Sequence, residues 1–252
     1  MDSTKEFNGL SGVYELGRPT YSNKFIDDLF IKYGFGDKSI VADIGSGTGK
    51  FAKQIIERGP FVYCVEPNDD MRNQAIRELK FYRNCKFVKG DASDTTLEAK
   101  SVDFITTAQA FHWFDERRFR TECSRILKPN GKVFLIWNMR DMNFEVTRES
   151  YNIYRKYCPK FKGFGGGIQK DDSRIINFFS TKYERYQYNN NLTFQKDKFL
   201  YRSLSGSYSL QPGDMLFEAY REELERLFDK YAVDGVIEMP NKTVVYVGTI
   251  TA

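Results

Sequence analysis

Histidine is almost absent from this sequence, and cysteine is scarce. The 252 residues contain one histidine, His112, and four cysteines, no two of which are separated by two residues. A zinc site with several histidines is therefore excluded, and a zinc ribbon, which needs closely paired cysteines, is not expected. A serine or cysteine hydrolase would have to use His112 as its base. We expect no metal site.

Long apolar runs and clustered positive charge are also missing. The longest apolar stretches, such as Val133–Trp137, fall far short of the ~20 residues that span a bilayer. The first residues, MDSTKEFNGL, show no signal peptide. The net charge of +4 comes from 38 basic and 34 acidic residues spread along the chain, without the basic stripe of a nucleic-acid-binding protein. We therefore expect a cytoplasmic protein with no membrane span and no nucleic-acid partner.

What the sequence does contain is enough apolar material for a core, since 41% of the residues are hydrophobic. In the first half, short β-branched or aromatic runs alternate with segments of helical periodicity, as in a parallel sheet. Strands are predicted at 39–44, 61–66 and 132–137, the last entered through the turn Pro129-Asn130-Gly131. After Trp137 the pattern changes to Tyr-rich and amphipathic helices, with a closing strand at 244–250. We predict one α/β domain whose second half carries an inserted helical cap.

Three alternating glycines follow the first predicted strand directly. Gly45, Gly47 and Gly49 precede a helix, and such a turn lets backbone N–H groups approach a ligand closely. Glu66 ends the next strand, where a carboxylate can accept both hydrogen bonds from a ribose diol. The sequence therefore predicts a nucleoside-bearing ligand across the carboxyl ends of the first two strands.

The glycine loop departs from two common nucleotide-binding motifs. A P-loop would need glycine at Ile44 and serine or threonine at Phe51. A dinucleotide fingerprint would place its third glycine one residue after Gly49. Neither motif is therefore present.

The order of motifs resembles the class I S-adenosylmethionine-dependent methyltransferases. The segment 43–49 resembles the first motif of that family, and Val65-Glu66-Pro67 with Met71 resembles its acidic ribose-binding motif. Gly90-Asp91-Ala92 resembles the segment that meets the adenine.

Two further segments resemble small-molecule methyltransferases of the trans-aconitate and ubiquinone/menaquinone-biosynthesis type. They are Tyr14 with Arg18-Pro19-x-Tyr21, before the first helix, and 108–114, after the fourth strand. The resemblance covers residues 10–140 well and the remainder only in layout. One departure is Lys132, which stands where the family has a second glycine before strand five.

The resemblance implies a Rossmann-like, doubly wound, mostly parallel seven-stranded sheet with an antiparallel last strand and an inserted helical cap. It implies a single methyltransferase domain over 1–252. Residues 1–140 would form the cofactor-binding core with an N-terminal lid segment, 141–240 the substrate cap and the sixth strand, and 241–252 the last strand. The implied cofactor is S-adenosyl-L-methionine and the implied substrate a small molecule. The oligomeric state is left open.

The resemblance also implies roles for individual residues. Asp43 and the glycine backbone would hold the cationic methionine end of the cofactor, Glu66 the ribose hydroxyls, Asp91 the adenine amino group and Arg18 the carboxylate. The cofactor-binding residues expected are Tyr14, Arg18, Asp43, Gly45, Ser46, Gly47, Glu66, Pro67, Met71, Asp91, Ala92, Gln109, Ala110 and Phe111. The substrate-facing residues expected are Tyr21, His112, Trp113, Trp137, Asn138, Arg140 and Arg202.

Methyl transfer from a sulfonium is an in-line displacement, which needs orientation and a dry site more than a protein nucleophile. A carboxylate acceptor is already ionised and needs no base. An enolic, phenolic or amine acceptor would benefit from one, and His112 is then the first candidate. The alternative role for His112 is a pocket-wall or hydrogen-bonding residue.

Two other functions stay open at this stage. One is a nicotinamide-dependent oxidoreductase, since Tyr82 and Lys86 have the spacing of a dehydrogenase pair, although they precede the third strand. The other is a non-catalytic S-adenosylmethionine-binding protein. A nucleic-acid methyltransferase is disfavoured, because no Asn-Pro-Pro-Tyr-like motif and no basic tail are present.

Overall fold

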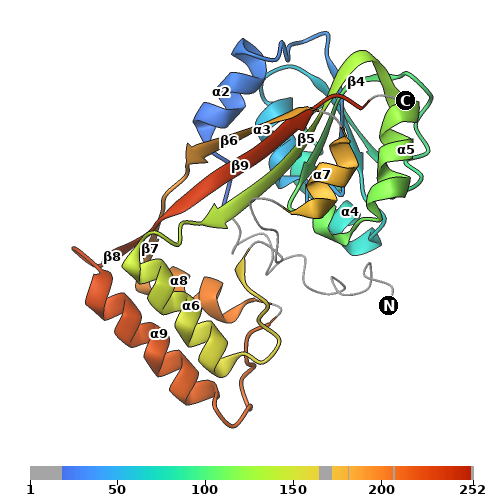
Figure 1. Ribbon diagram of the computed structural model, residues 1–252. Coiled ribbons are helices and arrows are strands. Elements are labelled where there is room, and N and C mark those ends of the chain that lie inside the picture. The colour runs from blue at the N-terminus through green and yellow to red at the C-terminus, as the bar shows by residue number, and fades with distance from the viewer. Residues whose placement is uncertain (1–18, 165–171, 181, 207, 251–252) are drawn as a thin grey trace.

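The computed structural model describes residues 19–164, 172–180, 182–206 and 208–250 (Figure 1). Strands and helices alternate through the first half of the chain, as predicted. The elements of this half are α2 (Asn23–Ile31), β1 (Ile40–Ile44), α3 (Lys50–Ile56), β2 (Phe61–Val65), α4 (Asp69–Leu79), β3 (Cys85–Val88), β4 (Val102–Ala108), the 3-10 turn η2 (Phe111–Trp113), α5 (Glu116–Ile126) and β5 (Leu127–Arg140). The second half adds α6 (Glu145–Tyr157), α7 (Ser173–Phe179), β6 (Tyr183–Asn189), β7 (Leu192–Gln195), α8 (Lys196–Leu204), α9 (Phe217–Tyr231), β8 (Val236–Met239) and β9 (Asn241–Gly248).

One seven-stranded sheet organises the molecule, in the order β3-β2-β1-β4-β5-β9-β6. Strands β1 to β5 pair in parallel, and β9 runs antiparallel to both β5 and β6. The predicted mostly parallel sheet with an antiparallel last strand is confirmed. The strand order reverses between β1 and β4, and in open α/β sheets a ligand crevice lies at that point, outside the carboxyl ends of the strands.

Each face of the sheet carries its own apolar core. Phe25 of α2 and Phe51 of α3 pack on one face, and Phe119 of α5 and Phe178 of α7 pack on the other, so helices cover both faces (Figure 1). A strand covered on both sides can be apolar at nearly every position. Strand β1, with the sequence IVADI, is buried at four of its five residues.

Strand β5 is much longer than predicted. It runs from Leu127 to Arg140 instead of 132–137, because it pairs with β4 from Leu127, opposite Val102, and with β9 as far as Arg140, opposite Asn241. The predicted turn at 129–131 lies within this strand, where the pairing with β4 shifts its register. Long-range pairing therefore extends the strand in a way that the local sequence does not show.

Beyond the end of β5, the chain forms a cap of helices α6, α8 and α9 with the small β7–β8 sheet. Figure 1 shows this cap projecting past the carboxyl end of β5 as a separate lobe. The cap has its own core, in which Tyr154, Tyr220 and Phe228 are buried. Asn241 begins β9 where the cap returns to the main sheet.

Several features are absent from the part of the chain that the structure describes. No helix there is both long enough and apolar enough to cross a membrane. No three His, Cys, Asp or Glu side chains there are grouped as metal ligands. All four cysteines are free thiols.

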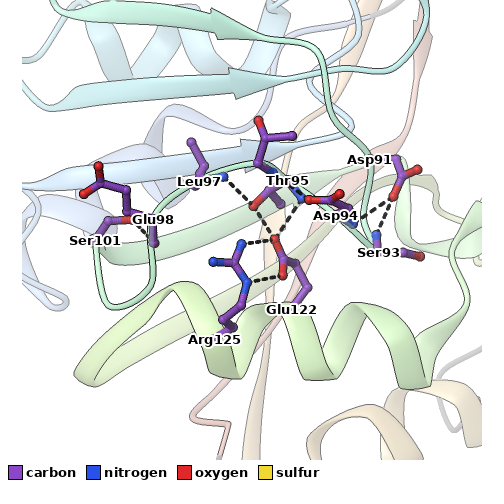
Figure 2. A network of polar contacts seen from close by, with 10 residues as sticks. Asp91, Ser93, Asp94, Thr95, Leu97, Glu98, Ser101, Glu122 and Arg125 are labelled. Carbon is purple, nitrogen blue, oxygen red and sulfur yellow. Dashed lines mark hydrogen bonds and ion pairs between the residues drawn. The ribbon is translucent and has the colours of Figure 1, made fainter.

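A buried carboxylate ties the long loop between β3 and β4 to helix α5 (Figure 2). Glu122 of α5 is 5% exposed. Its Oε1 accepts hydrogen bonds from the backbone N–H of Thr95, at 2.8 Å, and from the Thr95 hydroxyl. Arg125 donates to both oxygens of the same carboxylate at 2.7 Å. The loop that begins near Asp91 is thereby fixed to the helix.

The protonation of Glu122 should affect stability at acid pH. Burial opposes ionisation, but the hydrogen bonds from Arg125 and Thr95 hold the pKa of Glu122 below its usual range. The unfolded chain has the ordinary pKa of about 4.3. The stabilisation is therefore present above that pH and lost as the pH falls through the lower folded pKa.

We expect Glu122→Gln to lower the free energy of unfolding at pH 7 by about 1–3 kcal/mol, because a charged buried acceptor is lost. The variant should also lose less stability than the wild type below about pH 4.5. Urea unfolding followed by circular dichroism measures both effects. Glu98→Gln, at an exposed position of the same loop, is the control. Identical acid sensitivity in wild type and Glu122→Gln would contradict the assignment.

Candidate cofactor-binding site

A cavity of about 290 Å³ opens at the carboxyl edge of the sheet, around the ends of β1, β2 and β4. Its size lies at the lower end of the range for small-molecule sites. Most of the predicted site residues line it. These are Tyr21, Gly45, Ser46, Gly47, Glu66, Pro67, Met71, Asp91, Ala92, Gln109, Ala110, Trp113 and Asn138.

Two glycines of the loop after β1 have different surroundings: Gly45 is packed closely against a neighbouring loop, and Gly47 faces open space. Gly45 has φ +70°, and a Cβ atom there would lie 2.6 Å from Cβ of Ala110. Gly47 has φ +55°, and a Cβ there would meet nothing within 4 Å. Gly45 therefore lets the loops after β1 and β4 pack together, whereas Gly47 leaves a bare backbone cradle in the cavity wall.

Glu66 holds this cradle in place. The side chain is 8% exposed. Its Oε2 accepts from the backbone N–H of Gly47 and its Oε1 from that of Asn68, both at 2.9 Å. Burial raises the pKa of Glu66, and the two backbone donors oppose that rise. Each carboxylate oxygen keeps a further lone pair for a ligand hydroxyl.

Asp91 lines the opposite part of the cavity and organises its own loop (Figure 2). Its Oδ1 accepts from the backbone N–H of Ser93 at 2.6 Å and of Asp94 at 3.0 Å. Its Oδ2 accepts no hydrogen bond from the described residues. This exposed carboxylate therefore has an acceptor available for a ligand.

Gln109 adopts a conformation that is uncommon for a residue with a side chain. Its φ is +59°, and such strain is found mostly where the surrounding structure imposes it, often at functional sites. The Gln109 backbone N–H donates to the carbonyl of Ile136, and its Nε2 donates to the carbonyl of Asn138 at 2.9 Å. The turn after β4 is thus held against β5 at the cavity rim.

Asn138 joins three distant segments at the mouth of the cavity. Its Oδ1 accepts from the hydroxyl of Thr243 at 2.7 Å and from Nδ2 of Asn190 at 3.1 Å. Its Nδ2 donates to the carbonyl of Thr20 at 3.1 Å. The next residue, Tyr21, is 6% exposed and donates through its backbone N–H to Gln54. The segment before α2 is therefore attached to the rim.

Other predicted site residues do not line the cavity. Phe111 and Trp137 are buried in the core, with their rings 6.1 Å apart. His112 lies in η2 beside Trp113, at a ring separation of 5.1 Å. Tyr14 and Arg18 lie outside the described residues.

Arg140 and Arg202 lie together at a second, much smaller cavity. It has a volume of about 10 Å³ and lies where β5 and β9 meet the cap. These two arginines thus line the smaller cavity and not the larger one.

Sequence reasoning missed several residues that line the larger cavity. They are Pro19, Thr48, Lys50, Phe51, Asn68, Ser93, Ala108, Phe114 and Asp115. Each of them lies within or beside one of the segments that resemble methyltransferase motifs. Their closeness to those segments along the chain is the sequence signal that could have indicated them. Their side-chain directions depend on loop conformation, which the sequence does not show.

Asp43 lies beneath the glycine loop and is 1% exposed. Its Oδ1 accepts from the hydroxyl of Thr106 at 2.8 Å. Its Oδ2 is buried without a hydrogen-bond partner among the described residues. Burial raises the pKa of Asp43 to about 7, the Thr106 hydroxyl opposes the rise, and the negative charge of Glu66 adds to it.

The stability of the ligand-free protein should fall as the pH rises towards 7. The folded state keeps the proton of Asp43 up to about pH 7, whereas the unfolded chain releases it near pH ~4. Between pH 5 and 8 we expect the free energy of unfolding to fall by about 2–3 kcal/mol through this group.

Asp43→Asn should remove that fall, because the amide does not ionise. Urea unfolding at pH 5 and pH 8 measures it, with Asp234→Asn, at an exposed carboxyl, as the control. A slope as steep in Asp43→Asn as in the wild type would show that Asp43 is ionised across this range.

Comparison with known proteins agrees with this geometry. Residues 42–135 match the family model described as a methyltransferase domain. An uncharacterized methyltransferase of Mycobacterium tuberculosis is 35% identical over 148 residues, 59% of this chain and 58% of the relative. The chain thus spans little more than half the length of this relative.

Two further proteins extend the comparison. Demethylmenaquinone methyltransferase of Thermotoga maritima is 25% identical over 179 residues, 70% of this chain and 75% of that protein. One solved structure is a candidate methyltransferase from an antibiotic biosynthesis pathway of Anabaena variabilis. It superposes on this chain with a TM-score of 0.64 at 19% identity, and the match covers 93% of this chain and 99% of the other. Residues 42–135 are therefore similar to a methyltransferase domain, and the fold of the chain is that of a solved candidate methyltransferase.

Proposed function

We propose that this chain is an S-adenosylmethionine-dependent methyltransferase that transfers a methyl group by in-line displacement to a small-molecule acceptor. The observation that carries the proposal is the cavity at the reversal of strand order. Its wall combines the bare backbone of Gly47 with the carboxylate of Glu66 at the end of β2. These are the groups that a nucleoside with an amino-acid end requires.

The residues present fit this cofactor. Glu66 would accept hydrogen bonds from the ribose hydroxyls, and the exposed oxygen of Asp91 would accept one from the adenine amino group. Met71, 3% exposed, and Ala92, 7% exposed, offer apolar contacts on the adenine side. The Oδ2 of Asp43, below the loop, has no hydrogen-bond partner among the described residues. A cationic methionine end nearby would favour the ionised form of this carboxyl, which would then stabilise that positive charge.

When bound, S-adenosylmethionine supplies a methyl group on an electrophilic sulfonium. The chain has to hold the acceptor in line and exclude water. Trp113 and Phe114 line the cavity with apolar surface, and Gln109 and Asn138 form its rim. His112 does not line the cavity itself, but its neighbour Trp113 does. His112 is therefore the first candidate for a base if the acceptor must lose a proton, and its alternative role is a hydrogen-bonding residue behind the cavity wall.

We further propose a division of labour within a single domain over 1–252. Residues 1–140 bind the cofactor, 141–240 contribute the cap that selects the acceptor, together with the sixth strand, and 241–252 supply the last strand. The acceptor atom in this proposal is a carboxylate, enol or phenol oxygen.

The oxidoreductase alternative gains no support. The hydroxyl of Tyr82 donates to Glu57 at 2.6 Å in an exposed position. Neither Tyr82 nor Lys86 lines the cavity. The tyrosine and lysine that suggested a dehydrogenase therefore do not form its reaction centre.

Calorimetric titration tests the proposed cofactor. We expect S-adenosylmethionine and S-adenosylhomocysteine to bind at one site per chain, and NAD and NADP not to bind. Transfer of labelled methyl from S-adenosylmethionine to a metabolite mixture then separates an enzyme from a non-catalytic binding protein. Absence of binding by both sulfur compounds would overturn the proposal.

Glu66→Ala should weaken S-adenosylhomocysteine binding by about 10- to 100-fold, because hydrogen bonds to a charged acceptor are lost. Calorimetry measures the affinity, and thermal unfolding checks that the variant is folded. Glu218→Ala, at an exposed position of α9 that does not line the cavity, is the matched control. An affinity unchanged in folded Glu66→Ala would remove this residue from the ribose-binding role.

A further inference from the structure

Arg140 is a cation at the end of β5 with no anionic partner among the described residues. Within the described ranges, no carboxylate lies within ion-pair distance of its guanidinium. Its hydrogen bonds are long and go to neutral hydroxyls, at 3.4 Å to Ser150 and 3.5 Å to Tyr154. A guanidinium has five N–H donors, so the described residues use only part of its hydrogen-bonding capacity.

Aromatic rings fix the position of this charge. The guanidinium carbon lies 4.2 Å from the ring centre of Phe164 and 5.2 Å from that of Tyr154. Tyr154 belongs to α6 of the cap, and Phe164 follows that helix. We call the region around Arg140 and Asn241, where β5 and β9 meet the cap, the neck. Cation–π contacts hold an arginine in place but leave its in-plane N–H donors available.

The small cavity beside Arg140 is rich in donors and lacks an acidic side chain. Arg202 and Ser203 of α8, and Asn241 of β9, line it with Arg140 and three apolar side chains. Asn241 is 2% exposed, and its Nδ2 has no hydrogen-bond partner among the residues that the structure describes. A second positive charge and a buried amide donor therefore face the same space as Arg140.

Arg140 also lies next to the cofactor cavity. Asn138, at the rim of that cavity, is two residues earlier on β5. Side chains two apart on a strand point to the same face and lie about 7 Å apart. A small molecule at the rim would therefore reach Arg140 within the length of a few bonds.

We propose that Arg140 binds a carboxylate group of the methyl acceptor, with Asn241 and Arg202 completing the subsite. This inference rests on the proposed methyltransferase function. The acceptor is then an organic acid whose carboxylate is anchored at the neck, while the atom that receives the methyl group lies nearer Asn138 and Gln109. Arg140 is in this role a specificity residue.

Carboxylate fits this subsite better than phosphate. The in-plane N–H fork of a guanidinium matches the two oxygens of a carboxylate. The cavity of about 10 Å³ beside the guanidinium has room for about one water-sized group, so it can receive one carboxylate oxygen while the rest of the acceptor lies towards Asn138. A phosphate group carries more oxygens around its central atom and needs more space.

The test uses ¹⁵N-labelled full chain saturated with S-adenosylhomocysteine. The side-chain Nε–H signal of Arg140 is assigned by its loss in Arg140→Gln. Formate, acetate, benzoate and succinate are titrated, with acetamide and benzamide as neutral counterparts and inorganic phosphate as the competing anion. We expect at least one carboxylate to shift the signal saturably, and the amides and phosphate to leave it in place.

The carboxylate that binds best is then titrated against variants. Its affinity should fall by about tenfold or more in Arg140→Gln, since a charge-assisted pair is lost, and by less in Arg140→Lys. Arg226→Gln, at an exposed arginine of α9, is the matched control and should behave like the wild type. No shift with any carboxylate, an equal shift with the amides or phosphate, or equal binding by Arg140→Gln would overturn the proposal.

Binding of S-adenosylhomocysteine in the same samples separates the two proposals. If it binds wild type and Arg140→Gln within about twofold and carboxylates do not reach Arg140, this inference alone fails. If it does not bind the wild type, the proposed methyltransferase function fails.

Discussion

The carboxylate of Glu66 is the contact on which the shape of the cofactor cavity depends. Its two oxygens accept backbone N–H groups from Gly47 and Asn68, which belong to the loops after β1 and β2. The glycine loop so fixed packs through Gly45 against Ala110, in the loop after β4. Three loops from three parallel strands therefore form one unit, and an acid at the end of β2 serves both as structural acceptor and as proposed ribose ligand.

Charge is arranged with opposite signs at the two ends of the proposed site. Asp43 and Glu66 place buried carboxyl groups under the glycine loop, where burial raises the pKa of each. Arg140 and Arg202 place positive charge at the neck beneath the cap. A cationic cofactor would meet carboxyl groups at one end of the proposed site, and an anionic acceptor would meet arginines at the other end.

The sequence could predict the order of the elements and the loops of the cavity, because periodicity and glycine spacing are local properties. It could not predict which neighbours face the cavity. Trp137 and Asn138 are adjacent on β5 and point to opposite faces, so only Asn138 reaches the rim. The η2 turn likewise buries Phe111, whereas Trp113 lines the cavity. The contact of Glu122 with Thr95 joins residues 27 apart and leaves no local pattern.

The acceptor end of the site depends on long-range contacts, whereas the cofactor end depends on loops that are close in sequence. Asn138 meets Thr20, Asn190 and Thr243, and the length of β5 up to Arg140 is set by pairing with β9 about a hundred residues later. Substitutions in the cap can therefore reshape the neck without disturbing the unit that Glu66 holds. Under the proposed function, this separation gives a physical reason why one cofactor-binding sheet can serve different acceptors, and it makes the cap the part to examine for an acceptor.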